Sequence, residues 1–183
     1  SDLDLIPNGK LTYAALILVG KREAIKKHLP QAGVIVEFRN IDTQIHHDRR
    51  EDVIDPLYIA LDRIWRAIES RNSLIHISKG PYINDITVFD ETVIREALLN
   101  SIAHRDYSLT SEIVIRQSPK VIMIKNPGGF PKGVNLENLI TISSTPRSRL
   151  LSDVLLKTGL VERSGQGIDK IFSITLAQGK AEP

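Results

Sequence analysis

The stretch EALLNSIAHRDY, residues 96–107, places a carboxylate and a carboxamide one helical turn apart in a segment as apolar as a core helix. At 100° per residue its leucines and isoleucines cover one broad arc, while Glu96, Asn100 and Ala103 form a stripe with apolar residues on both sides. We expect this stripe to be at least partly buried. A buried carboxylate needs a hydrogen-bonding or charged partner, because removing a charge from water is costly. The stripe therefore either faces a polar pocket that holds a ligand or metal, or faces solvent with ordinary hydrogen bonds.

Composition limits the class of protein. With 183 residues, 42% apolar and 25% charged, the chain is typical of a soluble protein of one domain or two small ones. The formal net charge of +2 is too balanced to indicate a nucleic-acid or membrane surface. The absence of cysteine excludes disulfides, thiolate chemistry and cysteine-ligated zinc. No membrane span or signal peptide is apparent, so we expect no membrane partner and a cytoplasmic location. The only methionine is Met123, and we therefore expect the sequence to be part of a longer protein.

Hydrophobic periodicity predicts alternating helices and strands without an internal repeat. Asp90 is a candidate N-cap for the helix that carries Glu96. The predicted helices are 10–29 with a break at Gly20, 53–70, 91–104, 150–158 and 167–177. The predicted strands are 33–40, 74–77, 84–90, 111–117 and 120–125, the last two forming a hairpin around Ser118-Pro119. The predicted loops are the charge-rich 40–52, the glycine-rich NPGGFPKG at 126–133, and 134–149.

Several short motifs are candidates for phosphate binding, catalysis or metal binding. Gly165 and Gly167 precede a helical pattern, where free backbone N–H groups would suit a phosphate, although a plain turn is the preferred interpretation of these two residues alone. His104-Arg105-Asp106 resembles a protein-kinase catalytic loop, but the other kinase motifs are missing, which excludes that class. No P-loop or Rossmann fingerprint is present. The sequence His46-His47-Asp48 could supply metal ligands, but a solvated loop is the preferred interpretation.

Three motifs, taken in order, resemble a known family. Glu96-x-x-x-Asn100, the run 126–129 (NPGG) and Gly165-x-Gly167 look like the N, G1 and G2 boxes of the gyrase, chaperone, histidine kinase and MutL (GHKL) ATPases. The stretches REALLNSIAHRDY, KNPGGFPKGV and TPRSRLL…TGLVERSGQGIDKI more closely resemble the ATPase-like domain of bacterial transcriptional regulators and RecG-like ATP-dependent helicases. In that family the domain follows an AlbA-type, Schlafen-like DNA-binding domain. The resemblance is close over 85–175 and looser over 8–84.

The resemblance implies an α/β fold of the α+β type. The expected architecture is a two-layer, GHKL-like (Bergerat) sandwich, in which helices including 91–104 cover a mixed, mainly antiparallel sheet. Residues 1–84 would be an α/β connecting region that follows an N-terminal DNA-binding domain outside this sequence, and residues 85–183 would be the ATPase-like domain. DNA would be a partner through that N-terminal module, and a homodimer is left open.

The same resemblance implies ATP and Mg²⁺ as cofactors and assigns a role to each motif. Glu96 would be the general base that orients the attacking water. Asn100 would hold Mg²⁺ through its amide oxygen, so that the cation bridges the phosphates. The other residues implied to contact the nucleotide are Asn126, Gly128, Gly129, Gly165 and Gly167, with 130–163 as a mobile lid.

Two departures from the GHKL pattern leave hydrolysis open. Asn126 stands where these enzymes place Asp, so its amide oxygen would accept the adenine amino group without charge assistance. Ala103 stands where an acid is usual. The alternative function is a degenerate GHKL fold that serves as a dimerisation or structural scaffold without nucleotide turnover. A third hypothesis is a module that itself binds DNA through basic residues that are otherwise solvated charges, namely Lys21, Arg22, Lys26, Lys27, Arg49 and Arg50. No motor motif supports helicase activity.

Overall fold

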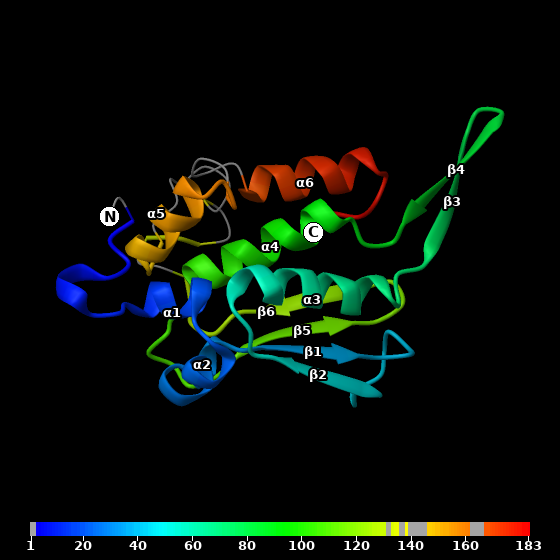
Figure 1. Ribbon diagram of the computed structural model, residues 1–183. Coiled ribbons are helices and arrows are strands. Elements are labelled where there is room, and N and C mark those ends of the chain that lie inside the picture. The colour runs from blue at the N-terminus through cyan, green and yellow to red at the C-terminus, as the bar shows by residue number, and fades with distance from the viewer. Residues whose placement is uncertain (1–2, 131–132, 136–137, 139–145, 162–166) are drawn as a thin grey trace.

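A four-stranded mixed sheet is covered on one face by two helices, α3 (Leu57–Glu69) and α4 (Glu91–His104) (Figure 1). This computed structural model describes residues 3–130, 133–135, 138, 146–161 and 167–183. In the order in which they lie side by side, the strands are β2 (Arg49–Val53), β1 (Val34–Phe38), β5 (Ile113–Gln117) and β6 (Ile122–Lys125). β1 pairs antiparallel with β2 and parallel with β5, and β5 pairs antiparallel with β6. The mixed, mainly antiparallel sheet of the predicted two-layer fold is therefore confirmed.

The core lies between this sheet and its helices. Alternation along β1 and β5 turns five apolar side chains toward the helices, and all are at most 3% exposed: Val34, Val36, Phe38, Ile113 and Ile115. Each such side chain contributes about 1.5–3 kcal/mol when it is removed from water. The helices supply residues at helical spacing, including Ile64, Ile68, Ile94, Leu98 and Ile102. The residues between the buried strand positions include Glu37 and Arg116, which form an ion pair at 3.0 Å.

The first predicted helix is two short helices, α1 (Tyr13–Val19) and α2 (Arg22–His28), as the break at Gly20 predicted. A side chain on Gly20 would collide with the carbonyl oxygen of Leu16, so the chain can turn closely here only with glycine. Two short 3₁₀ turns flank this region, η1 (Pro7–Gly9) and η2 (Pro30–Ala32). The helix predicted over 53–70 begins later, at Leu57, because Pro56 occupies its N-cap.

The last predicted helices are also present, as α5 (Arg149–Lys157) and α6 (Gly167–Ala177). α6 packs along α4 on the side away from the sheet (Figure 1). α4 is consequently covered on two sides, which explains why apolar residues occupy so much of its circumference. The Gln178 side chain donates a hydrogen bond of 2.7 Å to Asp90, so the end of α6 is attached to the start of α4.

β3 (Leu74–Lys79) and β4 (Tyr82–Thr87) form a separate antiparallel hairpin that projects from the rest of the molecule (Figure 1). These are the two strands predicted around the KGPY turn. No described helix is both long enough and apolar enough to cross a membrane.

One prediction of local structure is wrong. Residues 40–52 were predicted to be a loop, yet β2 begins at Arg49 within them. This strand lies at the edge of the sheet, where charged side chains remain in solvent while the backbone pairs with β1. Its charges also pair along the strand, Arg49 with Glu51 at 2.5 Å and Arg50 with Asp52 at 2.7 Å. The charge-rich composition that indicated a loop therefore belongs to an edge strand.

Strands from both predicted parts of the chain, 1–84 and 85–183, lie in the same sheet. β1 and β2 come from the first part, and β5 and β6 come from the second. The proposed boundary between a connecting region and an ATPase-like domain stays a prediction.

Candidate functional site

Asp90 caps the helix that carries the polar stripe, as predicted. Its Oδ1 accepts hydrogen bonds from the backbone N–H groups of Thr92 at 2.9 Å and Val93 at 3.2 Å. Its Oδ2 accepts the bond from Gln178 described above. The same carboxylate thus begins α4 and holds the end of α6 beside it, which fixes the two helices relative to each other.

The polar stripe of α4 meets the N-terminus of α6. A Cβ atom built on Gly167 would lie 2.5 Å from Oε1 of Glu96 and 2.8 Å from Nδ2 of Asn100. Glu96 is only 9% exposed. A side chain at position 167 would force the ends of the Glu96 and Asn100 side chains to shift, so three residues predicted from two separate motifs come together here. The N-terminus of α6 also favours a negative charge in its vicinity, because its first N–H groups have no partner within the helix.

Two buried amide atoms at the predicted site residues have no hydrogen-bond partner among the described residues: Nδ2 of Asn100 and Oδ1 of Asn126. A buried polar atom without a partner destabilises a protein by about 1–3 kcal/mol. A bound ligand that supplied the missing hydrogen-bond partner would remove this cost. An amide can present its nitrogen or its oxygen by turning through 180°, so Asn100 can offer a donor or an acceptor.

The glycine turn after β6 lies against the segment that follows α4. Gly128 has φ +101°, a left-handed conformation that favours glycine, and a Cβ there would lie 3.2 Å from Cβ of Asp106. The backbone N–H of Asp106 donates to the carbonyl of Pro127 at 3.3 Å. Arg147 donates to Oδ2 of Asp106 at 2.9 Å and to the carbonyl of Gly129 at 2.7 Å.

Sequence reasoning did not assign a role to Asp106 or Arg147. Asp106 was considered only within a kinase-like motif, and Arg147 lies 41 residues further along the chain, so no local pattern links them. Hydrogen bonds from the hydroxyl and backbone N–H of Ser108, together with Arg147, hold the pKa of Asp106 below its usual value. Burial, with the positive charge of Arg147, lowers the pKa of His104. The ionised carboxylate and the neutral imidazole thus lie beside the same guanidinium.

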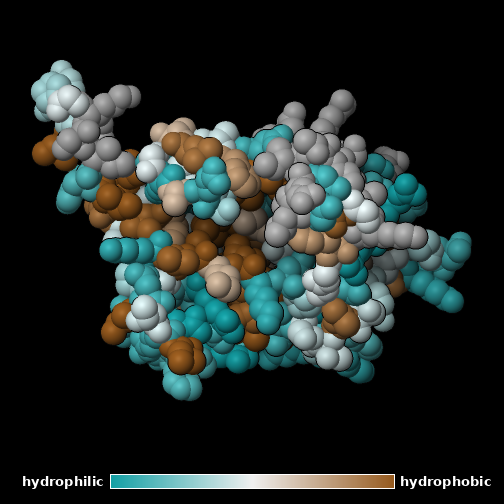
Figure 2. Space-filling view, turned by 180° about the vertical axis from the view of Figure 1, so that it is seen from behind, coloured by the Kyte–Doolittle hydropathy of each residue, from teal (hydrophilic) through white to brown (hydrophobic). Residues whose placement is uncertain are grey.

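Glu96 also lines a cavity of about 210 Å³ between α4 and the start of α6. Its other lining residues are Glu91, Thr92, Arg95, Gly159, Leu160 and Lys170. A neighbouring cavity of about 250 Å³ between α3 and α4 is more apolar and is lined by residues including Trp65 and Leu98. Seen from behind, the molecule has a hollow bordered by hydrophobic residues, as Figure 2 shows. Side chains of α4 therefore line both cavities as well as the packed core.

The predicted site residues fall into two groups. Glu96, Asn100 and Gly167 meet between α4 and α6. Asn126, Gly128 and Gly129 lie in or beside the turn at the end of β6. Gly165, like much of the predicted lid, lies outside the described residues.

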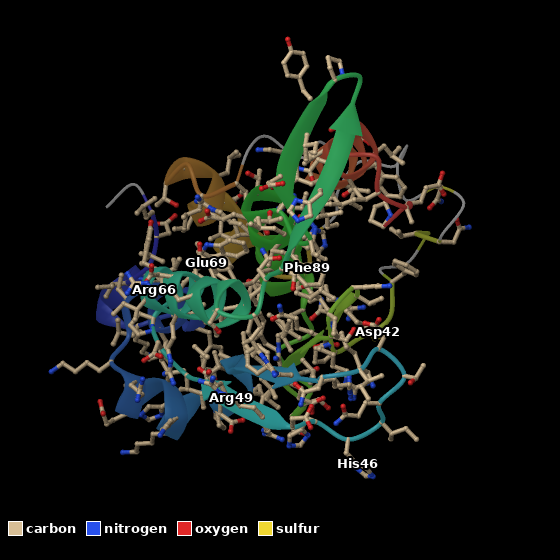
Figure 3. All side chains as sticks on the ribbon, turned by 90° about the vertical axis from the view of Figure 1, so that its right-hand side faces the viewer. Asp42, His46, Arg49, Arg66, Glu69 and Phe89 are labelled. Carbon is tan, nitrogen blue, oxygen red and sulfur yellow. The ribbon has the colours of Figure 1, made fainter. Side chains whose placement is uncertain are left out.

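The histidines weighed as metal ligands lie elsewhere. His46 lies in the loop between β1 and β2, and its side chain points outward (Figure 3). Asp48 of the same motif accepts hydrogen bonds from Asn40 and Gln44 instead. Within the described part of the chain, no three His, Cys, Asp or Glu side chains group in a way that could hold a metal ion.

Comparisons with known proteins support the predicted resemblance. Residues 110–183 match the model of a family described as "Putative ATP-dependent DNA helicase recG C-terminal". This range includes Asn126, the glycine turn and α6, but not α4. The family match suggests nucleotide binding. The comparison with curated proteins gave no match.

Among solved structures, the DIP2311 protein from Corynebacterium diphtheriae has a similar fold, with a TM-score of 0.83 and 22% sequence identity. The match covers 99% of this chain but only 36% of that one, so this chain spans little more than a third of its length. The predicted fold class is confirmed by this likeness, and the family match over residues 110–183 supports an ATPase-like domain.

Proposed function

We propose that this chain is an ATP-binding module of a bacterial transcriptional regulator, with the nucleotide held by α4, the glycine turn after β6 and the N-terminus of α6. The observation that carries the proposal is the contact of Gly167 with both Glu96 and Asn100. It joins a helix N-terminus, which suits phosphate, to the two polar residues of the predicted N box. The family match over 110–183 supports the same class of ligand.

The charges at this contact favour a phosphate together with a cation. A phosphate beside the carboxylate of Glu96 would be repelled unless a positive charge lay between them. Mg²⁺ would supply that charge and neutralise the phosphate oxygens. Asn100 would be its protein ligand through the amide oxygen, since Mg²⁺ sites commonly use few protein ligands and complete the shell with phosphates and water.

The remaining residues would hold the nucleotide. Oδ1 of Asn126 is buried and has no partner in the described part of the chain, which suits the amino group of adenine. Gly128 and Gly129 would let the backbone approach the ligand closely, and Gly165 and Gly167 would direct N–H groups at the phosphates.

Hydrolysis is the second part of the proposal. Glu96 would accept a proton from water as a general base, which requires an ionised carboxylate at working pH. The N-terminus of α6 beside it would favour a negative charge at this position. Access to water is provided on one side by the cavity that Glu96 lines.

Thermal unfolding with and without ATP and Mg²⁺ tests the binding. Ligand at 100 times its dissociation constant stabilises a native state by about 2.7 kcal/mol. Each kcal/mol raises the melting temperature of a chain of this size by roughly 2–4 °C, so we expect a shift of about 5–11 °C. Asn100→Ala should lose most of the shift. Glu96→Gln should keep it and lose any hydrolysis, because an amide cannot take a proton from water. Ser101→Ala, whose hydroxyl bonds the carbonyl of Ala97 within α4, is the matched control and should shift like the wild type.

Two outcomes would contradict this function. If the wild-type protein shows no shift in millimolar ATP and Mg²⁺, nucleotide binding is wrong, and a dimerisation or structural scaffold becomes the better account. If both Asn100→Ala and Glu96→Gln lose hydrolysis while they retain full binding, Asn100 is not the ligand of the cation.

A further inference from the structure

We propose that Arg147 is a positioning residue, which holds the glycine turn at 126–129 against the end of α4 and so shapes the nucleotide pocket before the ligand binds. The role in binding rests on the proposed function, because it takes this turn to be part of the pocket. The holding contact itself stands independently on the geometry around Arg147.

The guanidinium of Arg147 joins two segments through two different nitrogens. Nη1 donates to Oδ2 of Asp106 at 2.9 Å, and Nη2 donates to the carbonyl oxygen of Gly129 at 2.7 Å. A guanidinium is planar and rigid, so bonds from both of its terminal nitrogens fix the two acceptors relative to each other. A lysine ammonium is a compact charge and would not hold the two acceptors in one plane.

Asp106 is itself held in place. Its Oδ1 accepts from the backbone N–H of Ser108 at 3.0 Å and from the Ser108 hydroxyl at 2.6 Å. Its own N–H donates to Pro127 in the glycine turn. Asp106 directly follows Arg105, the C-cap of α4. The turn is therefore tied to the helix that carries Glu96 and Asn100 by one backbone bond and by Arg147.

Gly128 in the turn has a left-handed conformation, and an added Cβ there would lie 3.2 Å from Cβ of Asp106 and 3.6 Å from Cζ of Arg147. Arg147 also lies two residues before the first residue of α5. The glycine turn, the end of α4 and the approach to α5 thus meet at one side chain.

The Arg147 and Asp106 side chains are 30% and 29% exposed, so the pair is partly shielded from water. Loss of Arg147 would leave the turn free to adopt other conformations. If the turn were then in its binding form about a tenth of the time, the apparent dissociation constant would rise about tenfold, because affinity falls in proportion to the competent fraction.

The test compares Arg147→Gln with Arg149→Gln. Arg149 is an exposed arginine at the start of α5, for which the described residues show no hydrogen bond or ion pair, and it is the matched control. Hydrogen exchange of the Asp106 amide, which donates to Pro127 in the turn, is measured without nucleotide, and calorimetry gives the dissociation constant for ATP with Mg²⁺. We expect faster exchange and about tenfold weaker binding for Arg147→Gln, and wild-type values for Arg149→Gln. Arg147→Lys should recover only part of the affinity.

A double-mutant cycle distinguishes loss of the Arg147–Asp106 contact from a general loss of stability. Asp106→Asn should weaken binding in the same way, and adding it to Arg147→Gln should cause little further loss, because both changes break one contact. An unchanged rate of hydrogen exchange in Arg147→Gln would overturn the proposal, whatever the dissociation constant for ATP. Faster exchange with an unchanged dissociation constant would make the tie purely structural and overturn the positioning role. If the wild type itself does not bind ATP, the proposed function fails, and the positioning role fails with it.

Discussion

Glycine at position 167 allows the start of α6 to touch the polar stripe of α4. In an ordinary helix, alanine is more stable than glycine by up to about 1 kcal/mol. Here the added Cβ would lie 2.5 Å from the carboxylate of Glu96 and 2.8 Å from Nδ2 of Asn100, so the ends of these two side chains would have to shift. We expect Gly167→Ala to lower the free energy of unfolding in urea by about 1–3 kcal/mol, as overpacking does. Gly129→Ala is the control, since a Cβ there meets nothing within 4 Å. Equal stability of the wild type and Gly167→Ala would mean that the contact is looser than described.

His104 makes stability depend on pH. Its pKa lies below the usual value of 6.5 in the folded protein, because burial and then Arg147 disfavour the charged imidazolium. Between the two pKa values the unfolded chain binds more protons, so stability increases with pH through this window and the gain is complete above pH 6.5. We expect His104→Gln to flatten the pH dependence of the unfolding free energy in that window. His46→Gln, a change in the outward-pointing loop residue of Figure 3, should leave the curve unchanged, and an identical curve for His104→Gln would contradict this prediction.

The packing of α4 against α6 begins at one helix cap. Asp90 accepts two backbone bonds at the start of α4 and one bond from Gln178 beyond α6. Asp90→Ala should lower the free energy of unfolding by about 0.5–2 kcal/mol, the usual effect of losing a cap. Asp90→Asn should be milder, because its amide oxygen can still accept the backbone bonds. Chemical denaturation checks both, with exposed Glu91→Ala as the control. A greater loss for Glu91→Ala than for Asp90→Ala would show that the cap is unimportant.

At the scale of the whole molecule, basic and acidic residues are nearly balanced, and several arginines of the described part of the chain form ion pairs. The 24 basic residues are offset by 22 acidic ones. Among the residues considered for DNA binding, Arg22 pairs with Asp55, and Arg49 and Arg50 pair along β2. We expect this chain to bind duplex DNA more weakly than 1 µM at physiological salt, with an affinity that falls steeply as salt rises.

Fluorescence anisotropy with labelled duplex at about 50 and 200 mM salt measures this DNA binding. A Glu51→Gln, Asp52→Asn double variant, which frees two arginines on β2, should bind more tightly at low salt. Sub-micromolar binding by the wild type at the higher salt would overturn the prediction.

Local patterns in the sequence were sufficient to predict most helices and strands, and to predict the Asp90 cap at the start of α4. The helical spacing of α3 and α4, the Asp90 cap and the Gly20 break all depend on residues within a few positions of each other. Strand alternation around Ser118-Pro119 was sufficient for the hairpin of β5 and β6 for the same reason. The order of the motifs also led to the resemblance that the family match supports. The roles of the site residues stay predictions.

Tertiary structure decided the features that join distant segments. β2 forms because its backbone pairs with β1. This pairing does not need apolar side chains, and the charged residues of β2 therefore did not indicate a strand. β1 lies parallel to β5, which is nearly 80 residues further along the chain, as the Glu37–Arg116 bond shows. Gly167 meets Glu96 and Asn100, and Arg147 meets Asp106, only because α4, α5 and α6 pack as they do. Such contacts depend on shape and on bonds between remote residues, and neither leaves a periodic pattern in the sequence.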